Sequence, residues 1–133
     1  MALKARTVGI TVYNTHIESG RNRTLQSAQM AEIVTDQARL GERAVLIGGD
    51  FNNGPILQSL ALSSLANASF IDALGGDAAN RGPTSLGQTH PIDWLFIKRL
   101  TPGAGRIVDA KRASDHSPVM AALTLAPSLT ANR

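Results

Sequence analysis

Residues 44–52 read AVLIGGDFN, and this stretch indicates the fold of the chain. Its first four residues are all apolar, which is typical of a parallel strand that is buried on both faces. Gly48 and Gly49 then open the strand into a loop and would let the backbone approach a ligand. Asp50 and Asn52 follow at the strand end, where open α/β sheets place their sites. Glycine, aspartate and asparagine are also ordinary turn residues, so a simple turn is the alternative.

The sequence before this stretch predicts a strand and then a helix. Residues 7–15 alternate apolar side chains with smaller or polar ones, which is the pattern of a half-buried strand. Asn22 is a suitable N-cap for a helix over residues 23–40, and Gly41 is a suitable end. Apolar residues recur on one face of this helix, namely Met30, Ile33, Val34 and Ala38. Strand, helix and strand in this order predict an α/β layer.

The rest of the sequence predicts a short helix, a loop and three closing strands. The helix is expected from Pro55, which suits a first turn, to about Leu65. The stretch 75–88 is rich in turn residues and predicts a loop. The closing strands are expected at residues 92–97, 106–111 and 118–125. We therefore expect one domain over residues 1–126 and a flexible tail over residues 127–133.

Composition supports a folded single domain. Of the 133 residues, 43% are hydrophobic and 17% are charged, which separates the chain from disordered sequences. There is no cysteine, no leader-like apolar stretch at the N-terminus and no apolar run long enough for a membrane span, so a cytoplasmic protein is expected. The formal net charge of +3 agrees with a phosphate-bearing partner, although many proteins with no such partner are also basic.

Three further segments place polar residues beside apolar, strand-like runs. Asp93 lies inside an apolar run, where an unpaired carboxylate would cost several kcal/mol, so it needs a partner or a capping role. Asp115 and His116 precede the strand expected at 118–125, and the alternative for this pair is a surface turn. His16 ends the first expected strand, where a single histidine is more often structural.

Taken together, the four segments resemble the second half of the endonuclease/exonuclease/phosphatase family, the metal-dependent phosphoesterases that include deoxyribonuclease I. They are Asn14-Thr15-His16, Gly49-Asp50-Phe51-Asn52, Ile92-Asp93-Trp94-Leu95-Phe96 and Ser114-Asp115-His116-Ser117-Pro118. Each motif is short, but their order and separation cover nearly the whole chain. The resemblance implies an α/β (α+β) fold that is half of a four-layer sandwich, with one mixed sheet and helices on one face.

The resemblance also implies roles for these residues. It makes His16, Asp50, Asn52, Asp93 and His116 catalytic, with Asp93 orienting the imidazole of His116. It makes Asp50 and Asp115 ligands of Mg²⁺ or Mn²⁺, and Asn14, Asn52 and His16 contacts to the substrate. The expected substrate is a phosphate ester, a diester in preference to a monoester, as in nucleic acids or phospholipid headgroups. Arg23 and Gln26 are expected to be structural and to tie the helix to the sheet.

Nothing in the sequence matches the first half of the family, which carries the metal-binding glutamate. Only three glutamates are present, and of these Glu18 lies nearest a candidate site residue, His16. A single sheet with helices on one face would leave the other face bare, so we expect a homodimer that stacks two sheets, or a separate first half. The alternative function is a catalytically silent binding or assembly module that keeps the fold.

Overall fold

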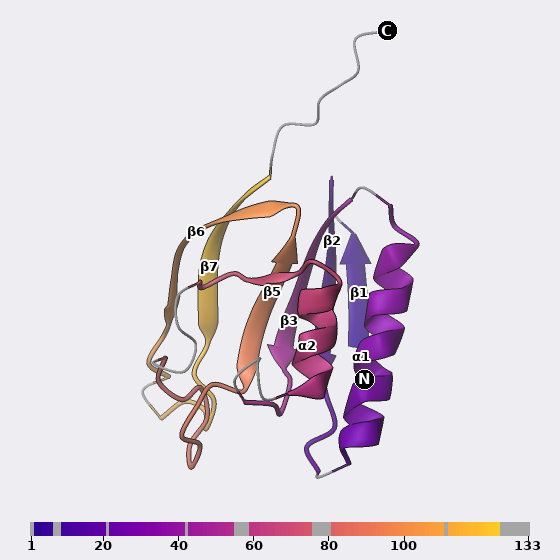
Figure 1. Ribbon diagram of the computed structural model, residues 1–133. Helices are drawn as coiled ribbons and strands as arrows, with labels where there is room; N and C mark the ends of the chain where they lie inside the picture. Colours follow the sequence, from indigo (N-terminus) through magenta and orange to yellow (C-terminus); the bar gives the residue numbers. More distant parts are fainter. Residues whose placement is uncertain are drawn as a thin grey trace, which may run out of the picture.

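The computed structural model describes residues 2–6, 9–20, 22–41, 43–54, 59–75, 81–110 and 112–125. Two helices and seven strands are assigned in these ranges (Figure 1). In chain order they are β1 (Ala2–Arg6), β2 (Ile10–His16), α1 (Arg23–Ala38), β3 (Ala44–Asp50), α2 (Leu60–Asn67), β4 (Ile71–Asp72), β5 (Asp93–Lys98), β6 (Leu100–Ile107) and β7 (Val119–Leu125). Neither helix is long and apolar enough to cross a membrane.

The main sheet has five strands in the order β1-β2-β3-β5-β4. Strands β2 and β3 are parallel and are connected through helix α1, whereas β1, β5 and β4 pair antiparallel with their neighbours. The expected mixed sheet is therefore confirmed. Strands β6 and β7 form a separate antiparallel pair. Parallel strands β2 and β3 end at the same edge of the sheet, which is the edge where the candidate residues of both strands lie.

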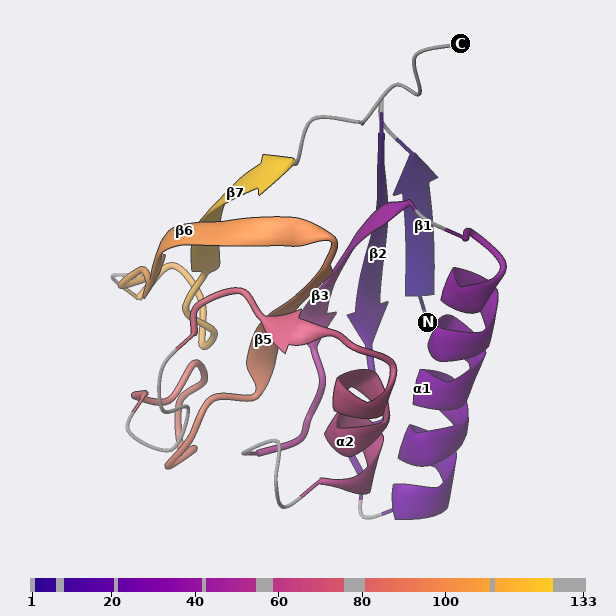
Figure 2. The same cartoon turned by 45° about the horizontal axis from the view of Figure 1, so that its top comes forward.

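Both helices cover one face of the main sheet (Figures 1 and 2). Side chains of β3 alternate between the two faces, and Val45 and Ile47 point to the helices. They belong to one buried cluster with Met30 of α1, Leu62 of α2 and Phe96 of β5. Tyr13 and Trp94 are buried in the same cluster, which confirms that they pack. Helices on one face are thus the expected arrangement.

The second face of the sheet is partly covered by the β6–β7 pair. Ala44 of β3 and Ile97 of β5 belong to a separate buried cluster that Ala121 and Leu123 of β7 pack against. The expectation of a bare second face is therefore wrong, because side chains of β7 pack against buried residues of this face. Three apolar side chains of this face, Val12, Leu46 and Leu95, remain partly exposed.

Helix α1 agrees closely with the sequence prediction. Asn22 caps it by accepting a hydrogen bond from the backbone N–H of Leu25 at 3.0 Å. Met30 and Ile33 are buried as predicted, but Ala38 is exposed, and the buried positions at the ends of this face are held by Gln26 and Gln37. The Gln26 side-chain amide donates to the carbonyl of Glu18 at 2.8 Å and so ties the helix to the loop after β2.

Several boundaries differ from the predictions. Strand β6 spans Leu100–Ile107 instead of residues 106–111, because an exposed strand of a two-stranded pair tolerates Pro102 and the irregularity that follows it. Helix α2 begins after its N-cap Ser59 and extends to Asn67, beyond the expected end at Leu65. Strands β1 and β4 were not predicted. Residues 7–8, 55–58, 76–80 and 126–133 lie outside the described ranges, so the start of the first strand, the Pro55 turn, part of the loop and the tail are not tested.

Candidate functional site

Three candidate residues occupy one level across three neighbouring strands. His16 of β2 is paired with Asp50 of β3, and Asp50 is in turn paired with Asp93 of β5. Neighbouring residues at one level of a sheet point to the same face, which here is the face opposite the helices. The three side chains come together because each strand ends or begins with a polar residue, and these residues are aligned across the sheet and point to the same face. The two carboxylates and the imidazole therefore converge at one edge of the sheet.

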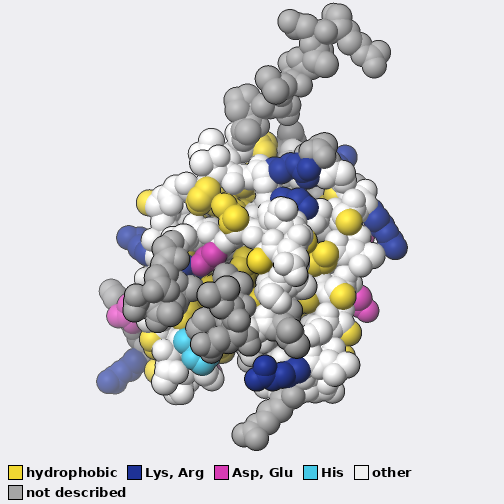
Figure 3. All heavy atoms as spheres, viewed as in Figure 1, with side chains coloured by type: hydrophobic (Ala, Val, Ile, Leu, Met, Phe, Trp, Pro, Cys, Tyr) yellow, Lys and Arg dark blue, Asp and Glu magenta, His cyan; other side chains and the backbone are white. Residues whose placement is uncertain are grey.

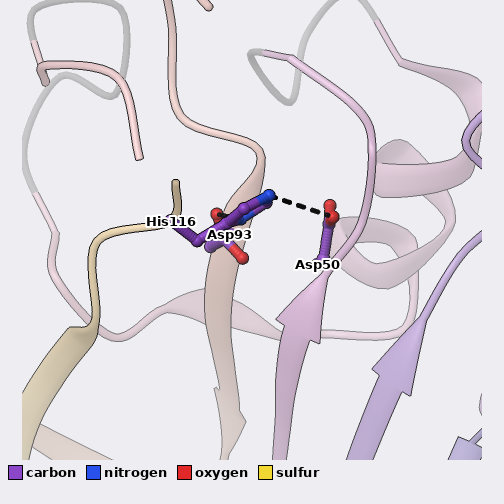
Figure 4. Close-up of side chains that lie close together, drawn as sticks. All are labelled: Asp50, Asp93 and His116. Atoms are coloured by element: carbon purple, nitrogen blue, oxygen red, sulfur yellow. Dashed lines mark hydrogen bonds and ion pairs between the residues drawn. The ribbon is translucent and has the colours of Figure 1, made fainter. Parts of the chain in front are cut away.

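His116 joins these residues from the loop that precedes β7. Its Nδ1 lies 2.8 Å from Oδ2 of Asp93, so the partner that Asp93 was expected to need is confirmed as a side-chain contact (Figure 4). The loop is shaped by Ser114, whose Oγ accepts a hydrogen bond from the backbone N–H of His116 at 3.0 Å. The Asp93 carboxylate accepting from Nδ1–H would leave Nε2 of His116 facing the open side of the site.

Asp50 lies between the two imidazoles. Its Oδ2 is 3.6 Å from Nε2 of His16 and 3.9 Å from Nε2 of His116. Its other oxygen, Oδ1, accepts a hydrogen bond from the backbone N–H of Asn52 at 2.8 Å, which fixes the carboxylate in place. The Asp50 side chain is 16% exposed and the His16 side chain is 69% exposed, so the Asp50 carboxylate is less accessible to solvent than the His16 imidazole.

The surroundings of the site shift two pKa values. Burial raises the pKa of Asp50, and the nearby charge of Asp93 raises it further, while the Asn52 backbone hydrogen bond and the two histidines lower it without cancelling the rise. For His116, partial burial lowers the pKa, but the hydrogen bond and the charge of Asp93 outweigh it and the pKa is raised. Both groups therefore hold a proton more readily than in an unfolded chain, and perturbed pKa values of this kind are common at functional sites.

The site opens into a cleft of about 490 Å³. The cleft is lined by Asn14, Thr15, His16, Gly49, Asp50, Asp93 and His116. A second open cleft of about 370 Å³ adjoins it and shares Gly49, Asp93 and His116 with the first. The imidazole of His116 thus lies between two spaces. Lys and Arg side chains are dispersed over the face seen in Figure 3 and form no basic patch there.

Two of the predicted site residues lie beside the cleft instead of lining it. The Asn52 side-chain amide donates to the carbonyl of Ile17 at 2.9 Å, and the residue has a positive φ of 47°. Its contribution in this geometry is to hold Asp50 through its backbone N–H. The Asp115 side chain is exposed, and its Oδ1 lies 3.4 Å from the Ser114 hydroxyl. The roles of Asn52 in binding substrate and of Asp115 in binding metal stay predictions.

A set of oxygen and nitrogen donors suited to a divalent cation is present. Asp50, Asp93 and His116 each offer one ligand atom, and these atoms lie within 4.8 Å of one another. Hard cations such as Mg²⁺ prefer carboxylate oxygens and keep several water ligands, so one or two carboxylates at an open cleft fit such an ion. Glu18, the nearest glutamate in the sequence, accepts a hydrogen bond from the Gly20 backbone N–H through its Oε1.

Gly49 shapes the site in a way that differs from the sequence interpretation. A Cβ atom at Gly49, whose φ is +138°, would lie 1.9 Å from the carbonyl oxygen of Thr15. A Cβ at Gly48 would lie 2.9 Å from a Leu95 methyl group. Gly49 is therefore required by the close approach of the β2 backbone, whereas a Cβ at Gly48 would meet the end of a flexible side chain. The expectation that they open the backbone to a ligand missed this packing role.

Sequence reasoning also missed Thr15 and Thr84. Thr15 lines the cleft between Asn14 and His16. Thr84 is buried behind Asp93 and accepts a hydrogen bond from its backbone N–H at 2.9 Å. Thr84 belongs to a segment that predicts a loop, and Thr15 belongs to the Asn14-Thr15-His16 motif, in which the sequence gives it no role of its own.

No protein family profile and no curated protein matches this sequence. Solved structures do match it. One is an endonuclease/exonuclease/phosphatase from Bacteroides vulgatus, with a TM-score of 0.70 and 21% identity, covering 88% of this chain and 50% of that one. A 3′-5′ exonuclease from Neisseria meningitidis matches with a TM-score of 0.69 and 18% identity, over 92% of this chain and 64% of that one. A mannosyl-6-phosphatase from Bacteroides thetaiotaomicron matches with a TM-score of 0.67 and 17% identity, over 87% and 51%.

These matches agree with the resemblance inferred from the four motifs. At such identities the likeness establishes the shared fold. The chain spans between about half and 64% of the length of these three structures. The chain therefore has the fold of half of an endonuclease/exonuclease/phosphatase protein.

Proposed function

We propose that this chain is a divalent-metal-dependent phosphoesterase that hydrolyses phosphodiesters. The observation that carries the proposal is the level of polar residues across β2, β3 and β5, completed by His116 beside an open cleft. Two imidazoles and two carboxylates in such an arrangement can bind an anionic oxygen and move a proton, which are the two tasks of phosphoester hydrolysis. The matched exonuclease and mannosyl-6-phosphatase belong to the same broad class of phosphoester hydrolases.

In this proposal His116 holds the phosphoryl group. Asp93 accepts a hydrogen bond from Nδ1–H of His116, which fixes the tautomer and turns Nε2 toward the cleft. The raised pKa of His116 keeps the imidazole protonated to higher pH, so that Nε2–H can donate to a phosphoryl oxygen. His16, on the other side of Asp50, would face the same phosphate from β2.

Asp50 is the proposed general base. Its Oδ2 faces the cleft between the imidazoles, and burial raises its pKa, which makes it a better proton acceptor for an attacking water. Asn52 holds the carboxylate through its backbone N–H, and the proposed contact of the Asn52 side chain with water or phosphate would need a different side-chain position. Asn14 lines the cleft and would contact the substrate.

The donor set fits Mg²⁺ or Mn²⁺, with Asp50 and Asp93 as the carboxylate ligands nearest each other. A bound divalent cation neutralises charge on the phosphoryl oxygens and lowers the pKa of coordinated water. Asp115 would join this set only if its exposed side chain turned toward the cleft. Burial is the larger cause of the raised pKa of Asp50, and a cation near the two carboxylates would offset the smaller contribution from the charge of Asp93.

A diester is favoured over a monoester by the shape of the site. The clefts of about 490 and 370 Å³ meet at Asp93 and His116. A phosphate bound at His116 would therefore have open space on both sides for its two ester groups. The second cleft adds Ser114 and Ser117 as polar contacts and Leu95 as an apolar one, which suits a mixed polar and apolar group such as a nucleoside or a glycerol.

We further propose that the protein acts as a homodimer in which the partly exposed sheet face of one copy meets that of another. The patch comprises Val12, Leu46 and Leu95, and it lies on the same face as His16, Asp50 and Asp93. A partner on this patch would therefore approach the candidate site. A separate chain that supplies a second sheet is the competing occupant.

The test of the hydrolase is an assay of bis(p-nitrophenyl) phosphate and p-nitrophenyl phosphate with Mg²⁺, Mn²⁺ or EDTA. We expect metal-dependent cleavage of the diester and a loss of about 10²- to 10⁴-fold in His116→Ala, since both the anion contact and the proton donor are removed. His90→Ala is the matched control, because His90 contacts Thr89 and lies outside the cleft lining. Equal activity of the two variants would contradict the assignment.

The effect of metal on the melting temperature distinguishes the proposed hydrolase from the alternative, a catalytically silent module. An ion that binds only the folded chain stabilises it, by about 2.7 kcal/mol when its free concentration is a hundredfold above the dissociation constant, and so raises the melting temperature. We expect this rise with Mg²⁺ or Mn²⁺ in the wild type and its loss in Asp50→Asn. A melting temperature that is the same in EDTA and in either metal would favour the silent module.

A further inference from the structure

A buried threonine joins the two segments that carry Asp93 and His116. Thr84 has an exposed fraction of 0%, and its Oγ1 accepts hydrogen bonds from the backbone N–H groups of Ile92 at 3.0 Å and Asp93 at 2.9 Å. In the described residues, β4 pairs with β5 only at Phe96 and Ile97. The Thr84 hydroxyl thus accepts hydrogen bonds from the backbone at the beginning of β5, where β4 does not pair with this strand.

The backbone around Thr84 contacts the His116 loop on its other side. The Thr84 carbonyl accepts a hydrogen bond from the Ser117 N–H at 2.7 Å, and the Leu86 N–H donates to the Asp115 carbonyl at 2.8 Å. Between these bonds, Ser85 forms an antiparallel bridge with His116. Residues 84–86 and 115–117 therefore run side by side as a short ladder, with His116 at its centre.

We propose that Thr84 is a positioning residue that sets the placement of Asp93 relative to His116. The Asp93–His116 contact of 2.8 Å joins residues that are 23 positions apart, and the His116 side chain is 34% exposed, so packing around the imidazole does little to fix it. Thr84 is hydrogen-bonded to both segments at once, through its hydroxyl to Ile92 and Asp93 and through its carbonyl to Ser117. Its catalytic meaning rests on the function proposed above, whereas its effect on the geometry of the pair does not.

Substitution of Thr84 by valine and by serine distinguishes a role of the hydroxyl as hydrogen-bond acceptor from a role of the side chain in filling the core. Thr84→Val keeps the shape of the side chain but removes the acceptor, which leaves the Ile92 and Asp93 N–H groups buried without a partner. The start of β5 must then shift until these groups reach water or another acceptor. Thr84→Ser keeps the acceptor and loses only a methyl group, so it should restore the placement of Asp93 if the hydroxyl is what matters.

Thr11 provides a matched control. It lies in β2 and is also fully buried, with an exposed fraction of 0%, but its Oγ1 has no hydrogen-bond partner among the described residues. Thr11→Val therefore makes the same chemical change at another buried site without releasing a donor. It should leave the Asp93–His116 pair unchanged.

The experiment is NMR of the full chain in EDTA with ¹⁵N-labelled histidine, in which the His116 ring signals are assigned by their loss in His116→Gln. In the wild type, Thr84→Ser and Thr11→Val we expect one Nδ1-protonated tautomer of neutral His116, held by Asp93. In Thr84→Val we expect a mixture of tautomers and faster exchange of the Nδ1 proton. A folded Thr84→Val with wild-type His116 signals would overturn the proposal. If Thr84→Val does not fold, Thr84→Ala replaces it under the same criterion, because its smaller side chain leaves room for water at the two N–H groups.

An activity measurement in the presence of metal then tests whether the placement of Asp93 by Thr84 affects catalysis. We expect Thr84→Val to lower kcat by about 10- to 100-fold with little change in KM, and Thr84→Ser to restore it. Altered His116 signals in Thr84→Val together with an inactive wild type would support the positioning role and contradict the proposed hydrolase. An active wild type together with unaltered His116 signals in Thr84→Val would support the proposed hydrolase and contradict the positioning role.

Discussion

The pair of Asp93 and His116 couples the site to the stability of the fold. The pKa of His116 is raised above its unfolded value of 6.5, chiefly because the hydrogen bond and charge of Asp93 outweigh partial burial. The folded chain therefore binds this proton more tightly than the unfolded chain. The resulting stabilisation is fully present below pH 6.5 and is lost as the pH rises through the folded pKa.

We predict that the melting temperature of the metal-free protein falls as the pH rises above 6.5, and that His116→Gln removes this fall. Asp50 contributes a fall of the same sign, but in a lower window that begins at its unfolded pKa of 3.8, because its folded pKa is also raised. Asp50→Asn should remove the lower fall. The measurement is thermal unfolding in EDTA at closely spaced pH values, with His90→Gln as control. A fall above pH 6.5 that persists in His116→Gln would contradict the role of the pair.

Sequence patterns could predict Asp93 and His116 because each stands out locally, as a charge in an apolar run and as an Asp-His pair before a strand. They could not predict how Asn52 or Thr84 act, because the partners of both residues are backbone groups in distant segments. The Asn52 amide donates to Ile17, 35 positions earlier, and the Thr84 hydroxyl accepts from Asp93, nine positions later. Such bonds depend on how strands and loops are placed side by side.

The spacing of β2 and β3 rests on a glycine. At Gly49 the strand passes so close to β2 that an added Cβ would lie 1.9 Å from the Thr15 carbonyl oxygen, and its φ of +138° is unfavourable for any other residue. We predict that Gly49→Ala destabilises the fold by about 2–4 kcal/mol, since the strands must separate or the backbone must change conformation. The displacement would occur one residue from Asp50, so activity should fall as well.

Denaturant unfolding measures this cost, and Gly82→Ala is the control. A Cβ at Gly82 would meet no atom within 4 Å, so its replacement should change the free energy of unfolding by no more than about 0.5 kcal/mol. Equal effects of the two substitutions would show that the contact between β2 and β3 at Gly49 relaxes without cost.

The elements that sequence patterns predicted well are those with a buried face. Helix α1 has an apolar stripe and a clear N-cap, and β3 is a continuous apolar run, so both were placed nearly correctly. Strand β6 was misplaced because most of its residues are exposed and no burial pattern marks them. Strand β1 and the two-residue strand β4 were missed. Their assignment depends on the neighbouring strands β2 and β5.

At the scale of the whole molecule, the two faces of the main sheet differ. Two helices and a large apolar cluster cover one face, whereas the β6–β7 pair covers only part of the other. The candidate site lies at the edge of this second face, since His16, Asp50 and Asp93 point to it. A partner that completes the face would therefore also form a wall of the cleft beside the two carboxylates.

The proposed homodimer predicts a solution mass of about twice the 14.0 kDa of one chain, measured by light scattering. Val12→Lys should give a folded monomer, because a charge on the partly exposed patch would be buried without a partner in the dimer but can reach water in the monomer. Ala31→Lys places the same charge on the exposed surface of α1 and should leave the dimer intact. Loss of activity together with the dimer would tie assembly to the site. A wild-type monomer that is active without a partner would contradict the dimer, since the uncovered face would then be compatible with catalysis.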